Sequence, residues 1–170
     1  MKIPVFVSSP TTLNKKQDQS RRKIIRELVK LNLVPNSLGR SDYPIDLPLR
    51  EVLVMAKHCS GGVILGFEQF FASKGKWKRN TTEQETLWKP KPFPTPWNHI
   101  ESGILFTLDL PLIVFCEEGI SGGIFDAGVS DVFIHKIPSS KLTQKAREEL
   151  SNVLVKWSAE VHNHYYKKYF

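Results

Sequence analysis

Short apolar runs alternate with segments of helical periodicity along the chain, which is the pattern of an α/β protein. The continuous apolar character of the runs indicates strands covered on both faces, expected at residues 3–7, 33–38, 61–66, 112–116 and 132–134. Apolar positions three and four residues apart predict helices that begin near Asp18, Leu49 and Trp97, and a last helix over 139–170. We therefore expect a single domain over residues 1–170, with a flavodoxin-like, doubly wound parallel sheet of about five strands.

The strands at residues 3–7, 62–65 and 112–116 are expected to be neighbours in this sheet. Helical segments separate them in the sequence, and such crossovers join parallel strands. Their lack of polar positions predicts nearly complete burial.

Residues 67–95 interrupt the alternation with a segment that is basic, aromatic and rich in proline. It is longer than an ordinary connection between a strand and a helix. We expect residues 68–95 to form an insertion that covers the ligand crevice as a lid or packs against another protomer. The segment is not expected to contribute a sixth strand to the core.

The formal net charge of +7 favours anionic ligands, either nucleic acid or small phosphorylated molecules. The basic residues gather in two clusters, the first comprising Lys15, Lys16, Arg21, Arg22, Lys23 and Arg26 and the second comprising Lys74, Lys76, Lys78 and Arg79. Neither cluster has aromatic residues interleaved at a regular stacking spacing, although Trp77 lies within the second. We interpret both as solvated basic surfaces, and nucleic-acid binding stays open.

Hydrophobic residues make up 41% of the chain and charged residues 24%, the proportions of a globular protein. Cys59 and Cys116 stand in apolar surroundings, which predicts buried thiols in a reducing compartment. The sequence shows neither a signal peptide nor an apolar stretch long enough to span a membrane, so we expect a cytoplasmic protein. Metal-ligand spacings and nucleotide-binding glycine motifs are also missing, and we expect no metal and no bound cofactor.

One charge lies on the predicted inner face of the helix that begins at Trp97. The apolar positions Trp97, Ile100 and Ile104 share one side of this helix, and Glu101 projects from the same side. A buried carboxylate must be paired, protonated or part of a cavity wall. The alternative is a glutamate at the border of the helix that reaches solvent.

Topology gathers further candidate residues around Glu101, because ligands of such sheets bind in a crevice at the carboxyl ends of the strands. Serine hydroxyls and backbone N–H groups there can bind phosphate, and an arginine can pair with pyrophosphate. Trp97 is interpreted either as a wall of the pocket or as ordinary core packing. The other candidates follow the first three strands in turn: Ser8 and Ser9, then Arg40 and Asp42, then Phe67.

A short motif links this helix to a known family. Trp97 and Glu101 form a Trp-x-x-x-Glu frame, the strand sequence LPLIVF follows at residues 110–115, and the chain opens with VFVSSP at residues 5–10. These stretches resemble TIR-like domains, whose enzymatic members use this glutamate to cleave the N-glycosidic bond of NAD. The same frame resembles nucleoside 2-deoxyribosyltransferases, whose glutamate attacks the sugar.

The resemblance implies that Glu101 is a catalytic carboxylate acting on NAD or a related nucleotide. A stand-alone domain of this kind resembles bacterial antiviral proteins that turn NAD into a signalling nucleotide, with a homo-oligomer or a separate effector protein as partner. Three functions follow: an NAD-cleaving enzyme, a nucleoside or nucleotide deoxyribosyltransferase or N-glycosidase, and a non-catalytic TIR-like assembly module. For both enzymes the chemical reason is the same, since a carboxylate stabilises the oxocarbenium ion that forms at the sugar.

Overall fold

In the computed structural model, residues 2–38, 47–130, 132–139 and 141–169 are described. Five strands form one central sheet, in which every neighbouring pair is parallel. In spatial order the strands are β2 (Leu33–Asn36), β1 (Ile3–Ser8), β3 (Gly62–Gly66), β8 (Leu112–Cys116) and β9 (Ile134–Lys136). This is the flavodoxin-like, doubly wound order, which confirms the predicted fold class.

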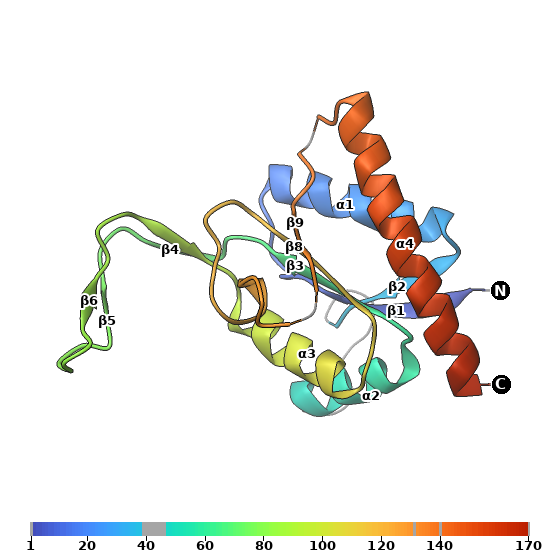
Figure 1. Cartoon of the computed structure of the whole chain (residues 1–170), viewed down its shortest axis with the longest axis horizontal. Coiled ribbons are helices and arrows are strands. Elements are labelled where there is room, and N and C mark those ends of the chain that lie inside the picture. Colours follow the sequence, from blue (N-terminus) through green and yellow to red (C-terminus); the bar gives the residue numbers. More distant parts are fainter. Residues whose placement is uncertain (1, 39–46, 131, 140, 170) are drawn as a thin grey trace.

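Helices cover both faces of the sheet (Figure 1). One face carries α1 (Lys15–Lys30) and α4 (Gln144–Tyr169), and the other carries α2 (Pro48–His58) and α3 (Pro96–Thr107). Each face therefore has its own hydrophobic cluster, as a sheet buried on both sides requires. No helix within the described ranges has the length and apolar character needed to cross a membrane.

The central strands have the arrangement that their apolar runs predict. β1 pairs with β3 and β3 pairs with β8, and their apolar side chains are buried. The edge strands differ from the prediction: β2 ends at Asn36, and β9 begins at Ile134, two residues after the predicted start. Phe133, inside the apolar run, is 85% exposed. An edge strand pairs on one side only, so hydrogen bonding to β8 sets its position more than hydrophobicity does.

The last helix also begins later than predicted, at Gln144 instead of near residue 139. Its buried positions are Leu150, Leu154, Trp157, Ser158 and Val161. The Trp157 indole N–H donates to the carbonyl oxygen of Pro111 at 3.1 Å and ties α4 to the start of β8.

Residues 70–93 form an arm outside the central sheet. β4 (Phe70–Ala72) pairs antiparallel with β7 (Lys91–Phe93), and β5 (Lys76–Trp77) pairs antiparallel with β6 (Glu85–Thr86). The arm adds no strand to the five-stranded sheet, and Figure 1 shows it extending away from the body of the protein. Closure of this segment over the crevice, or its packing against another protomer, stays a prediction.

The glycine at the end of β3 allows a short 3-10 helix, η1 (Gly123–Phe125), to pack closely against the strand. A Cβ atom at Gly66 would overlap the ring of Phe125. We therefore expect Gly66→Ala to lower the free energy of unfolding by about 1–3 kcal/mol, as overpacking does. Urea denaturation measures this change.

Gly103, an exposed glycine of α3, provides the matched control because an added Cβ there meets nothing within 4 Å. Alanine is a better helix former than glycine, so Gly103→Ala is expected to stabilise the protein by about 0.5–1 kcal/mol. Equal effects of the two substitutions would contradict the close packing at Gly66.

Candidate active site

The candidate site lies where the strand order reverses. From β1 the chain continues to β2 on one side, whereas β3, β8 and β9 follow on the other side. In doubly wound sheets, the carboxyl ends of the strands at this switch point form the ligand crevice. Helix α3 follows β3 in this sheet and packs against both β1 and β3. Asn98, in the first turn of α3, bonds to Ser8 and to Leu65 near the carboxyl ends of these strands, so this end of the helix lies at the edge where such sheets bind ligands.

The inner face of α3 is polar in its first half. The side chain of Thr95 caps the helix by accepting the N–H of Trp97 at 3.3 Å, and Pro96 begins the first turn. The buried positions are Asn98, Glu101, Ser102 and Leu105, which share one helical face.

The prediction that Trp97 and Ile100 lie on the inner face of α3 is wrong. Trp97 is 40% exposed and Ile100 is 44% exposed. Apolar residues occur on both sides of α3, so their periodicity does not single out the inner one. The inward position of Glu101 is confirmed, since only 8% of this residue is exposed.

A hydrogen-bond chain connects the helix to both central strands. The Asn98 side-chain Nδ2 donates to Ser8 Oγ at 2.7 Å and to the carbonyl oxygen of Leu65 at 3.4 Å. The Leu65 carbonyl can only accept, so the NH₂ group of Asn98 must face the strands. Because Ser8 Oγ accepts from Asn98, its own hydrogen is available to Glu101, with which it forms a hydrogen bond.

The surroundings of Glu101 tune its protonation. Burial raises the pKa of its carboxyl group from 4.5 to about 7, and the Ser8 hydroxyl partly offsets this by favouring the ionised form. Near neutral pH, both protonation states are therefore populated. A carboxyl group with such a pKa, placed at the carboxyl ends of the central strands, is typical of catalytic acids, bases and nucleophiles.

Asn98 also offers an unused hydrogen-bond acceptor. The residue is fully buried, and its Oδ1 atom has no partner among the residues that the structure describes. A buried polar atom without a partner is costly and is rare in native proteins. A ligand group that donates a hydrogen bond to Oδ1 would remove this cost.

Of the residues expected around Glu101, the structure brings Ser8 into contact with it. Ser9 directs its hydroxyl to the neighbouring carbonyl oxygen of Pro10 at 3.4 Å. Phe67 is fully buried in the cluster shared with α1 and α4, on the opposite face of the sheet from α3. Arg40 and Asp42 lie outside the described residues.

A second connection at this edge of the sheet involves a carboxylate. Glu117, directly after β8, accepts the backbone N–H of Glu68 at 2.6 Å and the side chain of Gln17 at 3.0 Å. Gln17 also takes part in the capping box of α1 with Asn14. Glu117 therefore fixes the first turn of α1 and the start of the chain leading into the arm.

The described residues give little support for a metal site or for a cysteine nucleophile. Within them, no group of three or more His, Cys, Asp and Glu side chains is arranged to hold a metal ion. Both cysteines are free thiols; Cys59 is buried, as expected, whereas Cys116 is only half-buried. Burial raises the pKa of Cys59 to about 11 and also raises the pKa of Cys116, which makes both thiols poor nucleophiles at neutral pH.

The hydrogen bond between Ser8 and Glu101 can be tested directly. Ser8→Ala is expected to raise the pKa of Glu101 above about 7, because the hydrogen bond that favours the ionised carboxylate is lost. The carboxyl carbon shift of Glu101, followed by NMR as a function of pH, measures this change. Ser9→Ala is the control and is expected to leave the titration unchanged. An unchanged titration in Ser8→Ala would contradict the contact.

Comparison with known proteins adds structural likeness only. No protein-family model and no curated protein matches the sequence. A CMP N-glycosidase from Clostridium botulinum, BcmB, has a similar structure, with a TM-score of 0.52 and 14% sequence identity over 89% of this chain and 98% of that one. The metal-soaked flavodiiron core of Flv1 from Synechocystis sp. PCC6803 has a TM-score of 0.46 and 8% identity over 96% of this chain and 36% of that one. At these identities, the likeness to BcmB shows a common fold.

Proposed function

We propose that this protein is an N-glycosidase that cleaves the bond between base and sugar in a nucleotide, with Glu101 as the catalytic carboxylate. The observation that carries the proposal is the state of Glu101, which is 8% exposed, bonded to Ser8 and has a pKa raised to about 7. The fold shared with a CMP N-glycosidase supports a nucleotide as the substrate class.

Cleavage of an N-glycosidic bond requires stabilisation of positive charge at the sugar. As the bond between C1′ and the base nitrogen breaks, the electron pair leaves with the base and C1′ gains oxocarbenium character. An oxygen of ionised Glu101 stabilises this charge or forms a C1′–O ester bond with the sugar. Water then hydrolyses the ester, which releases the sugar and restores the carboxylate.

Asn98 and Ser8 act as positioning residues in this proposal. Ser8 donates to Glu101 and limits the directions in which the carboxylate can point. The free Oδ1 of Asn98 accepts a hydrogen bond from a sugar hydroxyl, which satisfies the buried atom and orients the ring. Both groups are held by the central strands, which keeps their geometry rigid.

Two nucleotides are the first substrates to test. CMP is the substrate of the structurally similar glycosidase. NAD is the substrate that the resemblance of the Trp97–Glu101 frame to TIR-like enzymes implies, and its nicotinamide leaves without a strong general acid because it is already cationic. For CMP, the leaving cytosine takes a proton from solvent or from the site.

Incubation of the purified protein with CMP, other nucleoside monophosphates, NAD and deoxynucleosides tests the proposal, with products identified by mass. We expect free base and the corresponding sugar phosphate, or free nicotinamide if NAD is the substrate. Exchange of the sugar between two bases would instead indicate a deoxyribosyltransferase. Self-association without turnover of any of these compounds would contradict the proposal and favour an assembly module.

A further inference from the structure

The arm of residues 70–93 concentrates positive charge away from the candidate active site. It contains six lysine and arginine residues and two glutamates, so its net charge of +4 is more than half of the chain's +7. The segment is a narrow antiparallel ribbon with almost all of its side chains exposed or half-exposed. It therefore presents a basic surface that is accessible from several sides.

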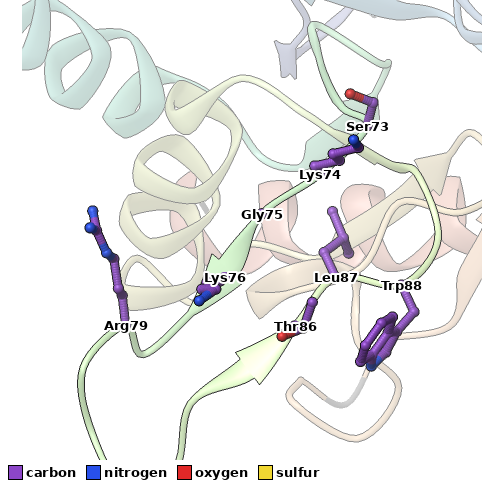
Figure 2. Close-up of a pocket in the computed structure, with 8 residues that line it drawn as sticks. All are labelled: Ser73, Lys74, Gly75, Lys76, Arg79, Thr86, Leu87 and Trp88. Atoms are coloured by element: carbon purple, nitrogen blue, oxygen red, sulfur yellow. The ribbon is translucent and has the colours of Figure 1, made fainter.

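The ribbon places aromatic residues beside these cations. Figure 2 shows Lys74 and Lys76 on one side of the arm, before and at the start of β5, and Leu87 and Trp88 on the other side, directly after β6. An open depression of about 700 Å³ is lined by these residues together with Arg79 and three others. Trp88 is 88% exposed, an unusual position for so large an apolar ring.

A second tryptophan of the arm, Trp77, has a lysine side chain over its ring. The Nζ atom of Lys91 lies 5.4 Å from the ring centroid of Trp77, which also packs against Phe93 at 5.6 Å. Trp77 is 46% exposed and is held in place by these contacts. The arm thus combines a fixed aromatic ring, a solvent-facing one and several exposed cations along one short ribbon.

We propose that the arm binds single-stranded nucleic acid. In this mode Trp88 stacks on a base, while Lys74, Lys76 and Arg79 contact the phosphates around it. Exposed aromatic rings beside a cationic track are the elements by which proteins bind single strands without sequence preference. Stacking requires bases with exposed faces, which a single strand offers and an intact duplex does not.

The distribution of charge and apolar surface favours this partner over two others. The tip, residues 78–84, contains no apolar side chain that could enter a lipid bilayer, and Lys78 and Glu83 pair across it at 2.6 Å. A second copy of this chain carries the same net charge of +7, which opposes close approach of two arms. A polyanion with stacking groups complements both features of the arm.

This inference does not depend on the proposed glycosidase reaction, and binding is measured without turnover. Fluorescence anisotropy of a labelled oligothymidylate of about twelve nucleotides, titrated with the whole protein at low salt, gives the affinity. Trp88→Ala is expected to weaken binding about tenfold, because one base loses its stacking partner. The double variant Lys74→Ala/Lys76→Ala is expected to weaken binding and to reduce the salt slope by about 1.4, for two lost phosphate contacts.

A control variant that loses the same charge outside the arm distinguishes binding by the arm from attraction by the net charge of the whole protein. Lys145→Ala/Lys156→Ala removes two exposed lysines of α4. We expect this control to keep the affinity within about twofold of wild type. Equal weakening by both double variants, or full affinity in Trp88→Ala, would overturn the proposal. Binding to phosphatidylserine vesicles without binding to the oligonucleotide, or arm-dependent dimerisation alone, would do the same.

Discussion

Glu101→Gln is expected to reduce the rate of base release by at least about a thousandfold, on the order of 4 kcal/mol of barrier. Glutamine keeps the length of the side chain and can still accept a hydrogen bond from Ser8. It carries no charge to stabilise an oxocarbenium ion, and its amide oxygen does not form the ester with C1′. The measurement is the initial rate of base release at pH 8, with the substrate that the wild-type protein cleaves fastest.

Glu118→Gln is the matched control for this loss of a carboxylate. Glu118 is exposed and follows β8 at the same edge of the sheet. We expect the control to retain the wild-type rate within about twofold. A Glu101→Gln variant that cleaves the substrate at the wild-type rate would show that another group performs the reaction.

At pH 8 the same Glu101→Gln substitution is expected to stabilise the fold by up to about 3 kcal/mol. Burial raises the pKa of Glu101 from 4.5 to about 7, and each unit of this rise in pKa corresponds to about 1.4 kcal/mol in the free energy of unfolding at high pH. The folded state therefore prefers the protonated carboxyl group. The stability that protonation contributes is fully present below pH 4.5 and is lost as the pH rises through about 7.

The predicted stability advantage of Glu101→Gln over the wild-type protein therefore grows as the pH rises. Near pH 4.5 the wild-type protein and Glu101→Gln are expected to have similar free energies of unfolding, because the carboxyl group is neutral in the folded state. Above pH 7 the variant is expected to be the more stable one. Urea denaturation across this range measures the difference, and Glu118→Gln controls for the loss of a surface charge. A variant that is less stable than wild type at pH 8 would show that the ionised Glu101 supports the fold.

Such a gain in stability with a loss of activity would also distinguish a catalytic group from a structural one. Functional sites often contain buried charges that lower the stability of the fold. They are kept because the reaction requires them. A glutamate retained only for packing would be expected to lower stability when it is replaced.

The sheet could be predicted because its central strands are buried on both faces. The apolar runs at residues 3–7, 62–65 and 112–116 lack polar positions, and this signal is local. The edge strand β9 is weaker because it pairs with β8 alone, and its position depends on hydrogen bonds that the sequence does not display. The start of α4 was likewise misplaced, since Leu142 lies four residues before Ala146 and continues the helical spacing ahead of Gln144.

Within the site, Glu101 was found from its place among apolar residues of α3, although two of them, Trp97 and Ile100, are exposed in the structure. Asn98 was missed although it lies three residues earlier, because the apolar residues of α3 were taken to define the inner face. Once Glu101 is taken as inward, helical spacing places Asn98 on the same side. Phe67 follows β3 as expected, but the chain turns it towards the other face of the sheet, which the sequence pattern does not reveal.

The arm shows a different limit of sequence analysis. No regular alternation of lysines and aromatic residues is found along the sequence, because Trp88 is distant from Lys74 in the chain. Antiparallel pairing of the ribbon brings the two residues to opposite sides of one depression (Figure 2). Which residues lie opposite each other in a hairpin depends on its register, and the register is not evident from the order of residues along the chain.

The most direct test of the central claim is the pH dependence of base release by the wild-type protein. If ionised Glu101 acts on the sugar, kcat/KM is expected to rise about tenfold per pH unit at low pH and to level off above its pKa of about 7. A rate that is independent of pH between about 5 and 8, or that falls as the pH rises through 7, would contradict the account.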